Sequence, residues 1–375
     1  MTSGAEIMTT KTLFMTRKWP PAVGGMETYS YRLCEELSCL IDIETLVLPG
    51  RADGRTPSVL ALIWFGLRMS FVVPFKARHF DVIHAGDMAL WPLALLGALF
   101  NSRARIVLSA HGTDVDYGDR SGLASAAYRH YLRLGARMLG KARIIANSNA
   151  TRERLGTHGY IDAPVVPLGT DCDQHSDTPP LPYVLFAGRL IPRKGCGWFI
   201  NNVLPQLPDH ITLCVAGVIS DVDEQAALDH PRVEFLGPVR GAALGELRRR
   251  ALAVVVPNID TGEACFEGFG LTAPEAAAAG GVTLVARLFG LTDAVIDGET
   301  GFLLEAGDAG AWADKINEID NWDATQRQRF VEAARAKVRQ YYSWSRVARD
   351  TLEIYTAKEM KALSPAEETA LNAAE

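Results

Sequence analysis

The sequence lacks the features that would place this protein outside the cell or on nucleic acid. Its six cysteines are scattered singly, without the close pairs of a metal site or redox motif, so reduced thiols of the cytoplasm are the simplest interpretation. The first ten residues lack the long apolar core of a signal peptide. The net charge of −6 and the pI near 5.8 argue against a nucleic-acid partner. These absences predict a cytoplasmic location.

Apolar runs long enough to cross a membrane are also missing from the sequence. Residues 59–75 carry one charge, Arg68, and residues 88–100 carry none, but both runs are shorter than the roughly 20 apolar residues that span a bilayer. The simpler interpretation is that both are buried helices of the first domain. The alternative is an apolar, partly basic surface that rests on a membrane or holds a lipid-linked acceptor. The charge of that surface would come from Arg51, Arg55, Arg68, Lys76, Arg78, Arg129, Arg133 and Arg137.

Short apolar runs alternate with helical patterns along the whole chain, which predicts parallel sheets covered by helices on both faces. Residues 169–182 are rich in Asp, Pro and Thr and lack periodicity, which indicates a linker. We therefore expect an α/β protein of two doubly wound, Rossmann-like domains, residues 1–176 and 177–344, that face a central cleft. The expected strands are residues 12–15, 44–48, 81–84, 105–109, 143–147, 165–167, 183–187, 212–216, 233–236, 253–256, 283–285 and 302–304.

The stretch Glu-Gly-Phe-Gly-Leu-Thr-Ala-Pro-Glu, residues 267–275, has the most informative local pattern. It follows an apolar strand and a polar loop and leads into a short helix. Thr272 and Glu275 have the spacing of a capping box at the start of that helix. A helix N-terminus with free N–H groups would then lie directly behind two glycines, where phosphate or a sugar hydroxyl binds readily. In the simpler alternative, Glu275 is a cap and nothing more.

Three other strand ends carry candidate binding residues. Gly24 and Gly25 open the first long helix and suit close approach to a phosphate, although such a pair is often only a turn and the three-glycine dinucleotide pattern is absent. Arg189 and Lys194 lie in a glycine-bounded loop after a strand. Cations at this place favour binding of a nucleotide diphosphate, and the alternative is that both are solvated surface charges. His111 could be structural, or it could bind a substrate hydroxyl or support developing charge.

Taken together, these segments resemble the retaining GT-B glycosyltransferases of family 4 over nearly the whole chain. The two glutamates with Gly-Phe-Gly-Leu between them are specific to that resemblance, whereas the Gly-Gly loop and the histidine alone are not. Two departures stand out: residues 280–283 lack the family's proline, and Asp293 replaces the family's glutamate. The segments that carry the resemblance are residues 24–25, 111–112, 147–148, 167–171, 188–195, 235–239, 267–275, 298–303 and 342–344.

The resemblance implies a role for each candidate residue. Arg189 and Lys194 would hold the diphosphate of a nucleotide-sugar donor, and Glu275 would bind its ribose. Glu267 would bind the sugar hydroxyls near the reacting carbon, and His111 would contact the sugar and support the transition state. The remaining donor-binding residues would be Gly24, Gly25, Val239, Phe269, Gly270, Leu271 and Thr272.

The activity implied by the resemblance is hexosyl transfer, with retained configuration, from a UDP or GDP sugar to a saccharide or lipid-linked saccharide in surface polysaccharide or glycoconjugate synthesis. No metal and no cofactor are implied, because Arg189 and Lys194 can neutralise the diphosphate. The family also implies that a C-terminal helix, residues 345–360, crosses back onto the first domain, and a flexible tail, residues 361–375, would follow it. Peripheral contact with the inner face of the membrane is left open. Two other functions also stay open: a glycoside hydrolase or phosphorylase that uses Glu267 and Glu275, and a non-catalytic nucleotide-sugar-binding subunit.

Overall fold

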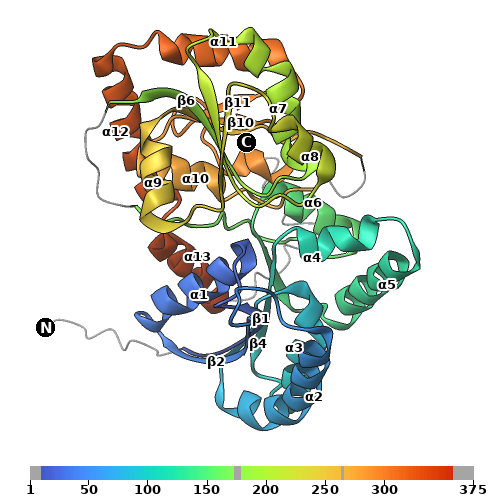
Figure 1. The fold of residues 1–375 in the computed structure, drawn as a ribbon. Coiled ribbons are helices and arrows are strands. Elements are labelled where there is room, and N and C mark those ends of the chain that lie inside the picture. Colours follow the sequence, from blue (N-terminus) through green and yellow to red (C-terminus); the bar gives the residue numbers. More distant parts are fainter. Residues whose placement is uncertain (1–9, 173–178, 263–265, 358–375) are drawn as a thin grey trace, which may run out of the picture.

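The computed structural model describes residues 10–172, 179–262 and 266–357. Figure 1 shows two α/β units stacked one above the other, each built on its own parallel sheet. The first sheet has the strand order β2-β1-β3-β4-β5, and the second has the order β11-β10-β9-β6-β7-β8. The predicted architecture of two Rossmann-like parallel sheets is therefore confirmed.

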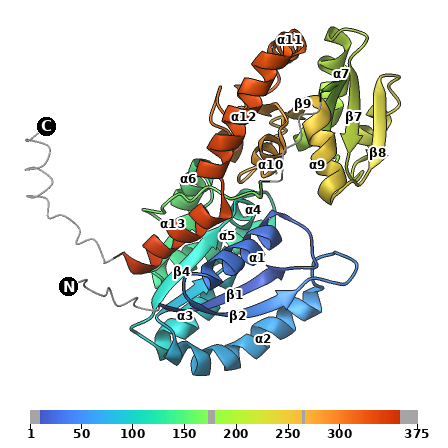
Figure 2. The same cartoon turned by 90° about the vertical axis from the view of Figure 1, so that its left-hand side faces the viewer.

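The first sheet is covered by helices on both faces. Leu13 and Met15 of β1 pack in one apolar cluster with α2 and α3, whereas Phe14 packs in another cluster with α1. This alternation follows from the two-residue period of a strand, and Figure 2 shows α1 and α2 on opposite sides of the sheet. The elements of this unit are β1 (Lys11–Trp19), α1 (Gly25–Ser38), β2 (Asp42–Pro49), α2 (Val59–Lys76), η1 (Ala77–His79), β3 (Val82–Ala85), η2 (Met88–Leu90), α3 (Trp91–Phe100), β4 (Arg105–Ala110), α4 (Thr113–Asp116), η3 (Tyr117–Asp119), α5 (Leu123–Met138), β5 (Arg143–Ala146) and α6 (Asn149–Thr157).

The second sheet has a fully buried central strand, β9, whose six residues are all apolar. Such a continuous apolar run is typical of a parallel strand that is covered on both faces. The elements of this unit are β6 (Leu181–Ala187), η4 (Pro192–Lys194), α7 (Cys196–Asn202), η5 (Leu204–Gln206), β7 (Thr212–Ala216), α8 (Val222–Ala227), β8 (Val233–Gly237), α9 (Gly241–Arg250), β9 (Ala251–Val256), α10 (Thr272–Ala279), β10 (Thr283–Ala286), η6 (Phe289–Asp293), β11 (Phe302–Leu304), α11 (Ala309–Asp320) and α12 (Ala324–Tyr341).

The last helix, α13 (Trp344–Thr356), lies against α1 of the first unit in both views (Figures 1 and 2). The hydroxyl of Tyr355 lies 2.6 Å from Nδ1 of His84 on β3, and Arg143 of β5 donates a hydrogen bond to the Ile354 carbonyl. These contacts hold the C-terminal helix on the first sheet, as the family resemblance implied. The division at residues 176 and 177 stays a prediction, because residues 173–178 lie outside the described residues, as does the predicted tail.

Two expectations about local structure are wrong. The strand expected at residues 165–167 is reduced to one isolated bridge between Val165 and Ala146, at the edge of the first sheet. The apolar run of α2 is only partly buried: Phe65, Met69 and Val73 lie in the core, while none of the described elements covers the opposite side of the helix. The exposed large apolar side chains of that helix are Val59, Leu60, Ile63, Trp64, Leu67, Phe71 and Phe75.

The helical stretch of α2 and η1 is also longer than the sequence pattern indicated. Continued through η1, it covers Val59–His79, 21 residues, and by length and composition alone it could cross a membrane. Its buried side nevertheless packs in one apolar cluster with β3 and α3. The helix is therefore a surface element of the first unit.

Candidate active site

The two units meet where the loop after β4 reaches the loop before α10. A Cβ atom on Gly268 would lie 2.0 Å from the carbonyl oxygen of His111, and one on Gly112 would lie 2.6 Å from the Cα of Gly268. Only glycine allows the two backbones to approach this closely. The structure thereby brings together the histidine loop and the two-glutamate segment, as expected from two sheets whose carboxyl ends face each other.

Two helix N-termini approach each other at the same place. α1 begins at Gly25, and a Cβ atom on Gly25 would lie 3.5 Å from a methyl group of Leu271, the residue before α10. Among the described residues, the backbone N–H groups of residues 269–272 donate no hydrogen bond. Both helix ends therefore present free donors and partial positive charge to one space, which suits an anion.

The capping box predicted for α10 is wrong. The cap position is held by Leu271, no side chain caps the helix, and Thr272 is already its first residue. Glu275 instead accepts a hydrogen bond at 2.5 Å from Arg248 of the neighbouring α9. A charged pair is stronger than a bond to a neutral N–H, so the carboxylate turns away from the helix end. This leaves more of the N–H groups for a ligand.

Glu267 is a buried acidic group held between two cations. One of its carboxylate oxygens lies 2.6 Å from the ammonium of Lys194 and 2.7 Å from the guanidinium of Arg193. Burial of Glu267 opposes ionisation, but the charges and hydrogen bonds of Lys194 and Arg193 outweigh it and lower the pKa of Glu267 to about 2. Glu267 is therefore a carboxylate at neutral pH.

The loop that carries these cations is fixed to the end of β9. Gly195 has φ of 72°, and a Cβ atom there would lie 1.9 Å from the carbonyl oxygen of Pro257. The backbone N–H of Ile259 also donates to the carbonyl of Arg193. Arg193 is the residue that sequence reasoning missed, although it stands next to Lys194 and its charge was visible. Arg189 is exposed and makes no ion pair within the described residues, so its guanidinium is available to a ligand.

His111 is buried and held from three sides. Its backbone N–H donates to Asp114 at 2.8 Å, its Nε2 donates to the Gly86 carbonyl at 3.0 Å, and its ring meets the Tyr29 ring edge-on at 4.6 Å. Burial raises the pKa of Asp114, with a further contribution from Asp87, while His111 and two backbone donors oppose the shift. The ring is thus positioned by other groups rather than free in solvent.

A chain of buried hydrogen bonds connects the support of His111 to the C-terminal helix. The Tyr29 hydroxyl lies 2.7 Å from the Ser109 hydroxyl, which lies 2.7 Å from Nε2 of His84. Nδ1 of His84 meets Tyr355 of α13. Burial, assisted by His111, lowers the pKa of His84 to about 3, so the chain is neutral. His84 therefore has a structural role.

The other predicted donor-binding residues differ in how deeply they are buried. Phe269 is buried against Tyr342, so only its backbone can reach a ligand. Val239 is half-buried in the loop after β8 and packs against a small apolar cluster of the second unit. Asp293, the substitution noted in the sequence, accepts hydrogen bonds from the backbone and side chain of Asn149. The shorter acid therefore joins α6 of the first unit to η6 of the second.

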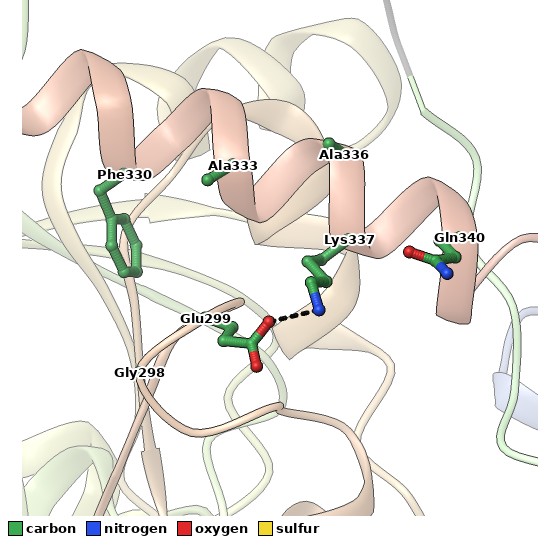
Figure 3. Close-up of a pocket in the computed structure, with 7 residues that line it drawn as sticks. All are labelled: Gly298, Glu299, Phe330, Ala333, Ala336, Lys337 and Gln340. Carbon is green, nitrogen blue, oxygen red and sulfur yellow. Dashed lines mark ion pairs between the residues drawn. The ribbon is translucent and has the colours of Figure 1, made fainter.

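A hollow of about 380 Å³ lies elsewhere, between α12 and the turn at Gly298. Figure 3 shows it bridged by the 2.6 Å ion pair of Lys337 with Glu299. Its lining shares no residue with the cleft, so we do not include it in the site. In the described part of the chain, no group of three or more His, Cys, Asp or Glu side chains could hold a metal ion.

Comparison with known proteins matches each half of the chain to a family model. A model of glycosyl transferases of group 1 matches residues 181–321, and a model of glycosyltransferase family 4 matches residues 23–174. The D-inositol 3-phosphate glycosyltransferase of Xylanimonas cellulosilytica is 31% identical over 58% of this chain and 59% of its own length. The phosphatidyl-myo-inositol mannosyltransferase of Mycobacterium leprae is 29% identical over 74% of this chain and 73% of its own. The chain thus spans less than two thirds of the first of these relatives.

Solved structures share the fold. HepE of Anabaena, determined in complex with UDP and glucose, aligns with a TM-score of 0.66 at 20% identity, over 92% of this chain and 99% of its own. Sucrose-phosphate synthase of Thermosynechococcus elongatus aligns with a TM-score of 0.68 at 20% identity, over 98% of this chain and all of its own. With the two matching family models, the paired parallel sheets and the two-glutamate segment at their junction, this chain belongs to the GT-B glycosyltransferases of family 4 and group 1.

Proposed function

We propose that the protein transfers a hexosyl group, with retained configuration, from a nucleotide-diphosphate sugar to a saccharide or lipid-linked acceptor. The observation that carries the proposal is the meeting of three features in one cleft: the Glu267 carboxylate with its two cations, the free N–H groups at the start of α10, and the start of α1. A sugar diphosphate has both a charged part for the helix ends and hydroxyls for a carboxylate.

In this mechanism the diphosphate lies against the two helix N-termini, where Arg189 and Lys194 neutralise its charge. Arg193 keeps Glu267 ionised and in place while Lys194 contacts the phosphate. Glu267 accepts hydrogen bonds from the sugar hydroxyls, and His111 borders the sugar. The bond between the anomeric carbon and the phosphate oxygen breaks, the acceptor oxygen forms the new bond on the same face, and its proton passes to the leaving diphosphate.

The acceptor class and the location are supported by relatives and by the cysteines. The mannosyltransferase relative is named for a phosphatidyl-inositol, which joins a lipid to free hydroxyl groups. We propose a lipid-linked acceptor with free hydroxyl groups for this chain. Cys34, Cys39, Cys196 and Cys214 are free thiols, which fits a cytoplasmic enzyme. A nucleotide-sugar donor is supported by the fold shared with HepE, which was solved with UDP.

The hydrolase alternative finds little support in the geometry. A glycosidase needs one carboxyl group that is protonated near neutral pH to act as general acid. Glu267 is ionised, and Glu275 is paired with Arg248. Both carboxyl groups accept hydrogen bonds from cations, so neither lies unpaired in an apolar environment. The non-catalytic alternative differs from the enzyme only in turnover.

The deciding experiment measures nucleotide-diphosphate release and free-sugar release from UDP and GDP sugars, with lipid and saccharide acceptors. A transferase releases the nucleotide diphosphate only together with a new glycoside, whose anomeric configuration is read by NMR. Free sugar as the main product would support the hydrolase. Donor binding in a thermal-shift assay, without turnover on any acceptor, would support the binding subunit.

A further inference from the structure

The outer side of α2 carries a continuous row of large apolar side chains that no element within residues 10–172, 179–262 and 266–357 covers. The side chains of this row are between 54 and 79% exposed. Large apolar side chains that are exposed together on one surface usually mark a binding site. We call this row the α2 apolar face, defined by Leu60, Ile63, Trp64, Leu67, Phe71 and Phe75.

The spacing of the row follows from the helix. Leu60, Trp64, Leu67, Phe71 and Phe75 recur every three or four residues, so they lie on one side of α2. Residues of the opposite side pack in the core of the first unit with α3 and the sheet. The helix is therefore anchored by its buried residues from Phe65 to Pro74, and its opposite side is left for a partner.

The charges carried by α2 and η1 themselves have one sign, although Lys76 pairs with Glu44 of the neighbouring β2. No Asp or Glu lies among residues 59–79. Arg68 is exposed beside the row, and the guanidinium of Arg78 lies 5.9 Å from the Phe75 ring and 5.6 Å from the ring of Phe100. These cations stand at the edge of the apolar surface, where the phosphates of a lipid headgroup layer would lie.

We infer that the α2 apolar face docks on the surface of an anionic lipid bilayer, with α2 lying flat in the interfacial layer. The inference deepens the lipid-linked acceptor of the proposed function, but it stands on the surface itself and does not depend on the donor assignment. Figures 1 and 2 both place α2 at the end of the molecule away from the second sheet, so docking leaves the second unit uncovered.

The same observations disfavour other partners for this face. A symmetric contact with a second copy would bring the same surface of both chains together, and the arginines would then face each other without an acidic complement. Insertion across the bilayer would require Phe65, Met69 and Val73 to leave the core that they share with the sheet. An anionic bilayer satisfies both the apolar row and its charges.

The test is sedimentation of the purified protein with vesicles, in the absence of donor and acceptor. One set of vesicles is phosphatidylcholine alone and the other also contains phosphatidylglycerol. We expect binding to the anionic vesicles to exceed binding to the neutral ones by at least about tenfold, and to weaken as salt rises. We expect the triple variant Leu60→Ser, Trp64→Ser, Phe71→Ser to lose at least about tenfold of that binding.

Three further variants distinguish specific docking of the α2 apolar face from nonspecific adsorption to vesicles. Arg68→Glu with Arg78→Glu keeps the apolar row and should abolish the preference for anionic vesicles. Val222→Ser changes a side chain of α8 that is 79% exposed in the second unit, and it should bind like the wild type. Leu123→Ser changes the exposed start of α5, the other helix of the first unit with exposed apolar and basic residues, and it should also bind like the wild type.

Several outcomes would overturn the inference. These are absent binding to anionic vesicles, full binding by the triple variant, or loss of binding by the Leu123→Ser variant alone. A dimer that the triple variant dissociates, without vesicle binding by the wild type, would assign the face to a second copy. Protein that alkaline carbonate fails to release would indicate a spanning helix. Because no donor is present, failure here is distinct from failure of the proposed transferase activity.

Discussion

Replacement of Glu267 by Gln tests the electrostatic centre of the cleft. The change keeps the shape of the side chain but removes the charge that Arg193 and Lys194 share. The pKa of Glu267 falls from 4.5, its ordinary value, to about 2. At about 1.36 kcal/mol for each unit, this difference corresponds to about 3 kcal/mol of folding free energy.

The sign of the pH dependence follows from the lowered pKa. A carboxyl group with a depressed folded-state pKa stabilises the fold fully above its unfolded pKa of about 4.5, and this contribution is lost as pH falls towards about 2. The wild type should therefore exceed the Glu267→Gln variant by about 3 kcal/mol at pH 7, and by only about 1 kcal/mol at pH 3.

The assay is urea unfolding of both proteins at the two pH values, followed by tryptophan fluorescence. Glu318→Gln is the matched control, because it removes an exposed ion pair with Lys315 that should contribute less than about 1 kcal/mol at either pH. Equal stability of the wild type and Glu267→Gln at pH 7 would refute the reasoning. So would a difference between them that is the same at pH 3 as at pH 7.

Three further predictions concern the donor, the contact between the units and the buried chain. Lys194→Ala should weaken binding of a nucleoside diphosphate by about tenfold to a hundredfold in calorimetry, because a charge-assisted hydrogen bond contributes about 1.5–3 kcal/mol. Gly268→Ala should lower both the melting temperature and turnover, because its Cβ would lie 2.0 Å from the backbone oxygen of His111 and the loops must separate. Tyr355→Phe should cost about 1–3 kcal/mol in urea unfolding, because Nδ1 of buried His84 loses its partner.

Each of these variants has a matched control in the same chain. Lys315→Ala removes a partly buried lysine of α11, outside the site, and should leave donor binding unchanged, so equal losses in both lysine variants would contradict a specific phosphate contact. Gly156→Ala adds a Cβ that meets no atom within 4 Å and should not destabilise; normal turnover in Gly268→Ala would show that the loops can separate freely. Tyr341→Phe changes an exposed ring, and its stability should match the wild type. A Tyr355→Phe variant as stable as this control would show that the hydrogen bond between Tyr355 and His84 does not stabilise the fold.

Much of the architecture follows from local pattern. Eleven of the twelve strands expected from apolar runs are present, because a parallel strand buried on both faces must be apolar over its length. The glycines at residues 112, 195 and 268 stand where backbones approach too closely for a Cβ atom. Such requirements act on single positions and are therefore visible in the sequence.

What only the tertiary structure decided is which groups meet. The sequence shows Arg193, Lys194 and two glutamates, but not that both cations reach Glu267 while Glu275 turns to Arg248. Those pairs join residues that are 27 to 74 positions apart, and no local spacing encodes them.

The burial of α2 was decided in the same way. A helix that is apolar on all sides has no polar stripe to show which side faces solvent, so the sequence favoured a buried helix. Burial depends on how many neighbouring elements pack around a helix. For α2, α3 and the sheet cover one side only.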